Sequence, residues 1–263
     1  MHICIIKRYL IVSFLMLFTM SAVANPMVIA HRGNSSEAPE NTLAAVQSAI
    51  ALDPQPQYIE IDLHQSQDGV LVVAHDENTL RTTGKSMMIR QTPFEQLRTL
   101  SAGYAERFGD AFAGEQLHTL NEVLERVEDT PIGIMIECKQ LLLEEPVIRL
   151  LRERGEVEKH VLASFDELTV YRSKEMEPQL RTLYLTTLSD GSRMRGHDVR
   201  ADIIGTNQSA SLDQIQQARE EGFSVWVWTV DDPEKMDQLI RVPADGIISN
   251  KPRLVWERIH SNR

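Results

Sequence analysis

The stretch "MVIAHRGNSSEAPENTLAAVQSAIALDPQPQYIEIDL" (residues 27–63) contains the unit on which the expected fold is built. Four apolar residues (27–30) are followed by a segment whose apolar residues recur every three or four positions (41–52), and then by a second apolar run (58–63). The runs are typical of strands buried on both faces, and the periodic segment is typical of a helix. A strand, a helix and a second strand joined by short links predict a parallel sheet.

The same alternation continues to the C-terminus. Further strands are predicted at residues 132–138, 161–165, 180–185, 201–205, 223–230 and 246–249. Further helices are predicted at residues 119–127, 144–155, 211–222 and 232–242, and two of these reach a glycine suited to a C-terminal cap. Eight strands separated by helices predict a closed TIM (β/α)₈ barrel rather than an open doubly wound sheet. Residues 190–199 are too polar for us to expect a regular helix there.

One segment interrupts the rhythm and predicts a small insertion after the second strand, at about residues 76–118. It follows a short apolar strand within residues 68–76, which an Asp-Gly turn joins to the second strand as in a hairpin. A short helix is expected at residues 92–100. An excursion of this length either folds over a functional site or is a tolerated surface insertion, and the pattern fits both.

Residues 1–24 read as a secretory signal peptide. Two basic residues precede an apolar run at 9–20, and the small-x-small pattern of residues 22–24 is typical of a cleavage site. We therefore expect cleavage after Ala24 and a periplasmic or secreted protein made of one barrel domain, residues 25–263. The alternative is an uncleaved membrane anchor, but the apolar run is shorter than the roughly 20 residues that span a bilayer, so no stable anchor is expected.

Composition limits the other possibilities. Removal of 24 residues from the 263-residue chain leaves 239, enough for one large core. It also removes Cys4, so Cys138 has no intramolecular disulfide partner. The removed part carries two basic and no acidic residues, and the formal charge therefore changes from −11 to −13. Such acidity argues against nucleic acid or an anionic membrane as a partner, although a local cation can still attract a small anion. None of these properties determines the oligomeric state.

Charged side chains gather where predicted strands end. Glu60 and Asp62 project from one face of their strand, and Glu137 and Lys139 project from one face of the next barrel strand. Three converging carboxylates without a thiolate predict a site for a hard divalent cation such as Ca²⁺ or Mg²⁺. The alternative is that these carboxylates only form salt bridges with Arg32 and Lys139, or line a solvated edge.

Two histidines stand out among the seven that follow the leader. His31 and His75 each end an apolar strand, at the position where a barrel gathers its site residues. Two imidazoles that face one cleft suit general acid and base catalysis near neutral pH. The remaining histidines are expected to be surface or packing residues, namely His64, His118, His160, His197 and His260.

Eight motifs in one order resemble the glycerophosphodiester phosphodiesterase family, and they extend over essentially the whole chain after the leader. They are "HRG" (31–33), "PENT" (39–42), "EIDLHQSQDGVLVVAHD" (60–76), "LRTTG" (80–84), "IECK" (136–139), "SF" (164–165), "VWTVDD" (227–232) and "DGIIS" (245–249). The resemblance implies a TIM barrel that uses one divalent cation to hydrolyse glycerophosphodiesters to an alcohol and sn-glycerol 3-phosphate. For an exported enzyme, Ca²⁺ is expected in preference to Mg²⁺.

The resemblance also implies a role for individual residues. The implied metal ligands are Glu60, Asp62 and Glu137, and the implied acid/base pair is His31 and His75. The implied substrate contacts are Arg32 and Lys139 at the phosphate, Asn41 as an orienting residue for the substrate or the His31 loop, and Phe165 and Trp228 at the glycerol. Aromatic residues in a buried strand also serve a barrel core equally well.

The chain departs from the family pattern at Asn250, where the family often has Asp, and we expect this to alter only a loop contact.

Two alternatives to the implied function are kept. One is a phosphodiesterase of the lysophospholipase D or sphingomyelinase D type, which acts on a lipid. The other is a non-catalytic exported barrel that binds phosphorylated ligands, which would have no use for an acid/base pair.

Overall fold

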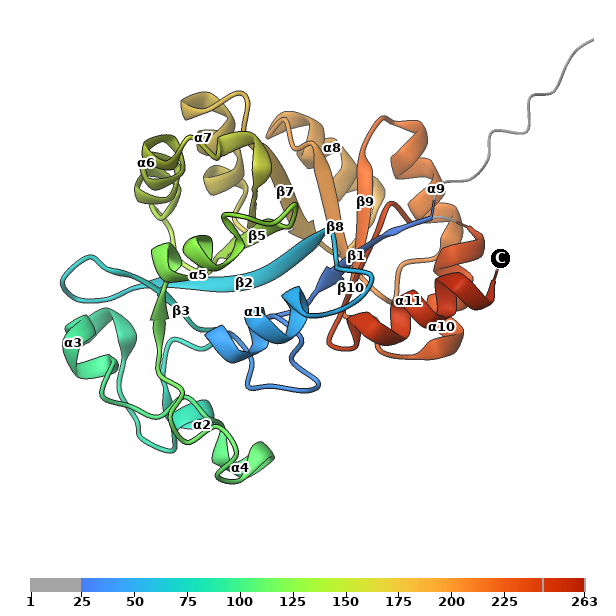
Figure 1. Ribbon diagram of the computed structural model, residues 1–263. Helices are drawn as coiled ribbons and strands as arrows, with labels where there is room; N and C mark the ends of the chain where they lie inside the picture. The colour runs from blue at the N-terminus through green and yellow to red at the C-terminus, as the bar shows by residue number, and fades with distance from the viewer. Residues whose placement is uncertain (1–24, 243, 263) are drawn as a thin grey trace, which may run out of the picture.

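The computed structural model describes residues 25–242 and 244–262, so the predicted leader lies outside the described part (Figure 1). Eight strands pair in parallel, and the pairing of β1 with both β2 and β10 closes them into a barrel. The barrel strands are β1 (Met27–Ala30), β2 (Tyr58–Gln65), β5 (Gly133–Cys138), β6 (Val161–Ser164), β7 (Arg181–Thr186), β8 (Ile203–Asn207), β9 (Ser224–Trp228) and β10 (Gly246–Ser249). The predicted TIM barrel is therefore confirmed, with each strand near its expected position.

Helices surround the barrel and fill most of the links between its strands (Figure 1). They are α1 (Leu43–Ile50), α5 (Leu120–Val127), α6 (Glu144–Arg154), α7 (Glu167–Met176), α8 (Asp190–Asp198), α9 (Leu212–Glu220), α10 (Pro233–Arg241) and α11 (Pro252–Ser261), with a 3₁₀ turn at Val157–Lys159. The Thr42 hydroxyl caps α1, and Gly155 ends α6 at φ +67°, a left-handed conformation that glycine adopts without strain.

Helix α8 was not expected, because its sequence has too few apolar residues for a periodic pattern. Two features stabilise it despite that polarity. Ser189 and Ser192 form a reciprocal capping box at its first turn, and the Arg193 guanidinium pairs with the carboxylate of Glu221 at 2.8 Å. On its inner face, Gly196 lets the helix approach the ring of Phe223 closely. Capping and tertiary contacts therefore produce a helix that amphipathic periodicity does not reveal.

The hydrophobic core has an inner and an outer part. Side chains inside the barrel include Ile29, Met135, Leu183 and Trp226, all at most 1% exposed. Larger clusters fill the space between the barrel and its helices. Cys138 lies in the outer core as a free, buried thiol. With both faces of every barrel strand covered, the continuous apolar runs of the sequence are explained.

The insertion lies between β2 and β5, as expected, on one side of the barrel (Figure 1). The Asp-Gly turn links β2 to the antiparallel strand β3, and Gly69 adopts φ +84° in this turn. The elements of the insertion are β3 (Leu71–Val73), α2 (Leu80–Thr83), a 3₁₀ turn (Ile89–Gln91), α3 (Phe94–Leu97), α4 (Ala105–Phe108) and β4 (His118–Thr119). A small core that includes Val72, Phe94 and Leu97 supports them.

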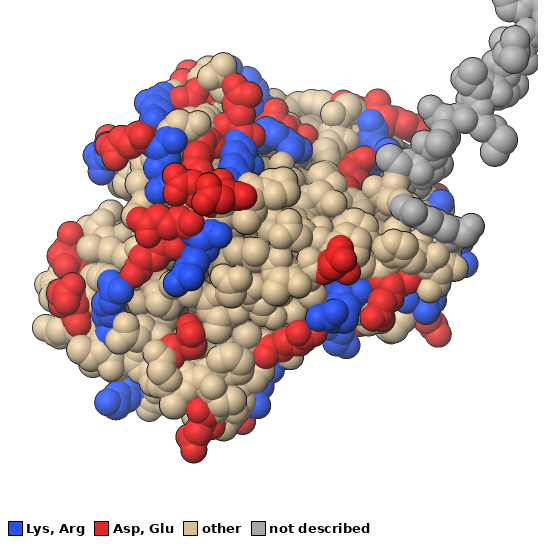
Figure 2. Space-filling view, in the orientation of Figure 1, with Lys and Arg blue, Asp and Glu red and all other residues tan. Residues whose placement is uncertain are grey.

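On the face of the molecule shown in Figure 2, basic and acidic side chains are interspersed, without a broad basic area. Among residues 25–242 and 244–262, every helix is too short or too polar to cross a bilayer.

Candidate active site

Three carboxylates from two neighbouring barrel strands meet inside the barrel. Strand β2 carries Glu60 and Asp62, and strand β5 carries Glu137 directly beside Asp62 in the register. One oxygen from each carboxylate can be chosen so that all three lie within 4.8 Å of one another. The alternation of side chains along β2 places its two carboxylates on the barrel interior, as the i, i+2 spacing predicts.

Burial and mutual repulsion perturb these carboxylates in different directions. Burial, then the charges of Asp62 and Glu137, raise the pKa of Glu60 well above its usual range. Burial and Asp62 likewise raise the pKa of Glu137, although Lys139 opposes the shift. For Asp62, burial alone would raise the pKa, but Arg32 and Lys139 outweigh it and lower the pKa. The strand ends therefore hold more negative charge than their surroundings compensate.

The donor set fits a divalent cation. Glu60 is 2% exposed, and its Oε1 has no hydrogen-bond partner, so this buried oxygen is available for a metal. The other oxygen of Glu60 accepts from the backbone N–H of Arg32 at 2.8 Å. Carboxylate oxygens without thiolate or imidazole in the group match the preference of Ca²⁺ and Mg²⁺. Glu60, Asp62 and Glu137 together could therefore hold a divalent cation.

Two cations lie against the carboxylates, as the salt-bridge alternative also expected. The Arg32 guanidinium lies 3.1 Å from Asp62, and the Lys139 ammonium lies 2.6 Å from Glu137 and 3.3 Å from Asp62. Two cations beside three carboxylates leave one negative charge in excess, while Glu60 keeps its free oxygen. Salt bridges therefore account for part of this cluster, and they do not occupy the whole donor set.

The loop after β1 presents Arg32 in an unusual conformation. Arg32 has φ +55°, which is uncommon for a residue with a side chain. Next to it, Gly33 packs so closely on α1 that a β-carbon would lie 2.6 Å from Ala45. Its close packing and the hydrogen bond from Arg32 N–H to Glu60 hold the loop in place. Such strain is typical of a functional site, and here it directs the guanidinium toward the carboxylates.

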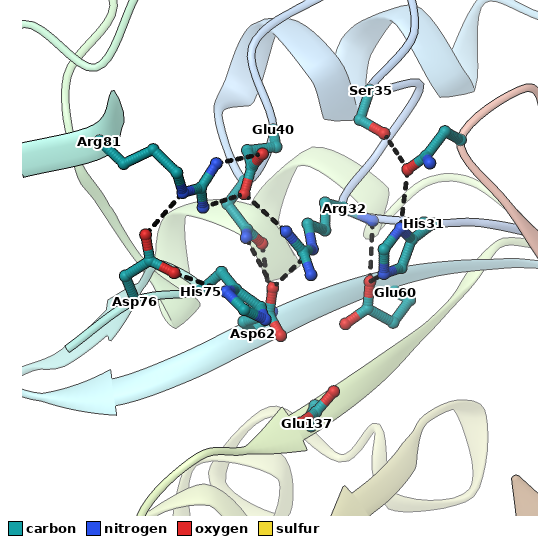
Figure 3. Close-up of polar contacts among 12 residues, drawn as sticks. His31, Arg32, Ser35, Glu40, Glu60, Asp62, His75, Asp76, Arg81 and Glu137 are labelled. Carbon is teal, nitrogen blue, oxygen red and sulfur yellow. Dashed lines mark hydrogen bonds and ion pairs between the residues drawn. The ribbon is translucent and has the colours of Figure 1, made fainter. Parts of the chain in front are cut away.

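Both predicted histidines lie beside the carboxylates (Figure 3). His31 Nε2 is 3.8 Å from a Glu60 oxygen, and burial followed by the charge of Arg32 lowers the pKa of His31 to about 4. His75 follows β3 and lies close enough to Asp62 for its charge to act on that carboxylate. The structure thus brings together two imidazoles from opposite sides of the carboxylate group.

A network that the sequence did not point out supports His75. The Asp76 carboxylate accepts from His75 Nδ1 at 2.7 Å, and Arg81 donates to Asp76 at 2.6 Å (Figure 3). Arg81 also binds both oxygens of Glu40, at 2.8 and 2.9 Å, and Glu40 in turn accepts from Arg32 at 2.8 Å. The insertion, through Arg81 of α2, therefore completes the site instead of being only a surface excursion.

Two asparagines contact the site in ways that differ from expectation. The Asn41 backbone N–H donates to the carbonyl of Arg32, which fits the predicted role for the His31 loop, but its side chain donates to Asp62 at 2.8 Å. Asn250 was expected to change only a loop contact. Instead its side-chain oxygen lies 2.7 Å from His31 Nδ1, so it contacts a proposed catalytic residue.

A cavity of about 280 Å³ opens above the carboxylates. Eight of the ten predicted site residues line it, namely His31, Arg32, Glu60, His75, Glu137, Lys139, Phe165 and Trp228. The other two, Asp62 and Asn41, are buried and hydrogen bonded to each other. The rings of Phe165 and Trp228 meet edge to face, with centroids 5.7 Å apart, and form an apolar wall beside a charged floor. The arrangement suits a ligand with one anionic end and one less polar end.

The other histidines lie away from this cavity or support it. His64 is buried, and its Nε2 lies 3.1 Å from the carbonyl oxygen of His75. His118 and His160 are buried, whereas His197 and His260 lie on the surface. All five are packing or surface residues, as predicted.

A model of the glycerophosphoryl diester phosphodiesterase family matches residues 31–254. The chain belongs to this family. It is 33% identical over 233 residues to a glycerophosphodiester phosphodiesterase of Caldanaerobacter subterraneus, a match that covers 86% of this chain and 94% of that protein.

Solved structures of related proteins agree. A phosphodiesterase of Oleispira antarctica, solved with the product sn-glycerol-3-phosphate, is 26% identical with a TM-score of 0.80, over 90% of this chain and 97% of that one. A glycerophosphodiester phosphodiesterase of Agrobacterium tumefaciens is 29% identical with a TM-score of 0.76, over 88% and 98% of the two chains. The family assignment from eight motifs is therefore confirmed, and the family match includes every predicted site residue.

Proposed function

We propose that this protein hydrolyses glycerophosphodiesters to an alcohol and sn-glycerol 3-phosphate, with one divalent cation and with His31 and His75 as the acid/base pair. The observation that carries the proposal is the cavity itself. Two of the three carboxylates, both cations and both imidazoles line it, and the third carboxylate lies within 4.8 Å of the other two. Membership of a phosphodiesterase family supports the proposal, as does the product bound by the Oleispira relative.

Hydrolysis of a phosphodiester has two difficulties, namely repulsion of the nucleophile by the anion and a poor alkoxide leaving group. A bound divalent cation would polarise the phosphoryl oxygens and offset their charge. Arg32 and Lys139, which already lie within 3.3 Å of the carboxylates, would donate to the same phosphoryl group. The apolar wall of Phe165 and Trp228 would lie against the glycerol carbons and exclude water from that side.

The two imidazoles divide the proton transfers in this proposal. His31 would take the proton from the attacking hydroxyl, which is either water or the neighbouring hydroxyl of the glycerol. His31 suits this role because its lowered pKa keeps the ring neutral at neutral pH. His75 would give a proton to the departing alcohol, and the Asp76 carboxylate, which accepts from His75 Nδ1, would orient that ring.

Two parts of the proposal rest on the sequence. We propose Ca²⁺ in preference to Mg²⁺ because the protein is expected to be exported, and calcium is abundant outside cells. Export itself rests on the pattern of residues 1–24, which lie outside the described part of the structure.

One observation favours a second candidate, hydrolysis of a lysophospholipid by a lysophospholipase D-type reaction. Large apolar side chains that follow strands β5 and β6 are exposed by half or more, namely Leu141, Leu142, Phe165 and Leu168. These residues follow the C-terminal ends of their strands, at the end of the barrel that holds the cavity, where an acyl chain could contact them. A non-catalytic barrel is disfavoured, because mere binding of a phosphorylated ligand would need no second imidazole.

A turnover assay with two substrates tests both candidates. Purified protein is incubated with glycerophosphocholine or with lysophosphatidylcholine, first with a chelator and then with Ca²⁺ or Mg²⁺ in excess. We expect cation-dependent release of choline and sn-glycerol 3-phosphate from the first substrate, and loss of this activity in Glu137→Gln. Cation-dependent release of choline from the lysophospholipid alone would support the second candidate instead. Turnover that survives exhaustive chelation would contradict the metal assignment.

A further inference from the structure

Asn250, directly after β10, joins His31 to a second group of polar residues. Its Oδ1 lies 2.7 Å from His31 Nδ1 and also accepts from the Ser35 hydroxyl at 2.8 Å. Its Nδ2 donates to Asp231 at 2.6 Å. The side chain therefore has three partners, which come from the loop after β1 and from the segment after β9.

The partners determine which way the amide points. Asp231 accepts hydrogen bonds from the Ser249 hydroxyl and from the backbone N–H of Asn250, each at 2.9 Å, in addition to the side-chain amide. A carboxylate offers only acceptors, so the NH₂ group of the amide must face Asp231. The amide oxygen must therefore face His31, because reversal of the amide would set two acceptors against each other at 2.6 Å.

This orientation decides which nitrogen of His31 carries the proton. An amide oxygen can only accept, so His31 Nδ1 must donate to it. In the neutral ring the lone pair then lies on Nε2, the nitrogen nearest to Glu60 and the carboxylate group. We propose that Asn250 is a positioning residue that holds His31 in the Nδ1–H tautomer and thereby makes Nε2 the atom that accepts the proton in the reaction. The catalytic part of this inference rests on the proposed function.

The two histidines differ in the partner that orients them. His75 Nδ1 has the carboxylate of Asp76 as its acceptor, whereas His31 Nδ1 has a neutral amide. A carboxylate offers charge compensation to an imidazolium, and an amide offers only a hydrogen bond. This asymmetry matches the proposed division of roles, with His31 as base and His75 as acid. The Asn at position 250, where the family often has Asp, is therefore part of the active site.

Histidine tautomers are read directly by NMR of protein labelled with ¹⁵N in histidine, with the His31 signals assigned by their loss in H31Q. We expect wild-type His31 to be protonated at Nδ1 at neutral pH in the absence of substrate. S35A is the matched control, because it removes the other donor to the same amide oxygen and leaves the acceptor for His31. The tautomer should persist in S35A and be lost in N250L.

Turnover of glycerophosphocholine gives the second readout. A base in the wrong tautomer costs about the full contribution of general base catalysis, so N250L should lower kcat by about 10² to 10⁴-fold with little change in KM. In the double variant D231N/N250D, the residue at 250 still accepts from His31, and the residue at 231 now donates to the residue at 250. This variant should restore the Nδ1–H tautomer, and the tautomer is its readout, because the carboxylate that it places beside His31 would also stabilise the imidazolium.

If NMR finds wild-type His31 protonated at Nε2, the inference is overturned, even if N250L fails to fold. Normal turnover in the same protein would leave the proposed function intact. Turnover by N250L at the wild-type rate overturns the catalytic part. No turnover of any glycerophosphodiester by the wild type, with an intact Nδ1–H tautomer, overturns the proposed function, and the catalytic part falls with it.

Discussion

The substitution Glu60→Gln should separate metal binding from stability. In the cation-free protein, Glu60 is buried, its Oε1 lacks a partner, and two further carboxylates raise its pKa. Glutamine keeps the acceptor for the Arg32 N–H and replaces the free oxygen by a donor aimed at Asp62 and Glu137. Relief of one unsatisfied buried group is worth about 1–3 kcal/mol. At about 2–4 °C per kcal/mol for a chain of this size, Tm should rise by roughly 2–12 °C in chelator.

The cation should stabilise the wild type and leave the stability of Glu60→Gln unchanged. A cation at a hundredfold excess over its Kd stabilises the folded state by about 2.7 kcal/mol, which corresponds to a rise in Tm of roughly 5–11 °C. Wild type should show this rise, and Glu60→Gln should not. Glu95→Gln, the same change at an exposed position of the insertion, should behave as wild type. The measurement is differential scanning calorimetry in chelator and in Ca²⁺ or Mg²⁺.

The pH dependence of the free energy of unfolding follows from the Glu60 carboxylate. In the cation-free wild type, the folded state holds the Glu60 proton more tightly than the unfolded state does. The free energy of unfolding should therefore fall as the pH rises from the ordinary glutamate pKa toward the raised one, and Glu60→Gln should flatten this slope. A Glu60→Gln protein that has a lower Tm than wild type in chelator and still shows the cation-dependent rise would contradict Glu60 as an unsatisfied metal ligand.

Three further predictions follow from the site and the leader. H31A and H75A should each lower kcat by about 10² to 10⁴-fold. The loss in H75A should be smallest with a p-nitrophenyl ester, because its leaving group needs no proton. Equal sensitivity of both variants to the pKa of the leaving group would contradict the division of roles. Arg81→Gln removes the hydrogen bond to Asp76 and should lower kcat about tenfold, because a charged hydrogen bond contributes about 1.5 kcal/mol. Arg90→Gln, on the exposed side of the insertion, should leave kcat unchanged. Steady-state kinetics measures both variants. Mass spectrometry of exported protein should find a new N-terminus after Ala24, and an intact leader would contradict export by cleavage.

The sequence predicted those features that depend on local pattern. All eight barrel strands follow from short, mostly apolar runs, and the three carboxylates follow from side-chain alternation within β2 and β5. Helix α8 escaped prediction because a serine capping box and contacts across the chain stabilise it, and neither leaves a periodic signal.

The sequence also did not predict contacts between segments that lie far apart along the chain. Arg81 meets Glu40 from 41 positions away, and Asn250 meets His31 from 219 positions away. The motifs "PENT" and "LRTTG" contain two of these residues, but only closure of the barrel and folding of the insertion place them together. Asp76, the immediate neighbour of His75, was the member of the network that a local reading could have found.

The most direct test of the account is hydrolysis of glycerophosphocholine in ¹⁸O-labelled water, with the products analysed by mass spectrometry in chelator and with a divalent cation. Attack at phosphorus within the cavity predicts one ¹⁸O atom in sn-glycerol 3-phosphate, none in choline, and no products in chelator. Label in choline, equal turnover in chelator, or no turnover with either Ca²⁺ or Mg²⁺ would contradict it.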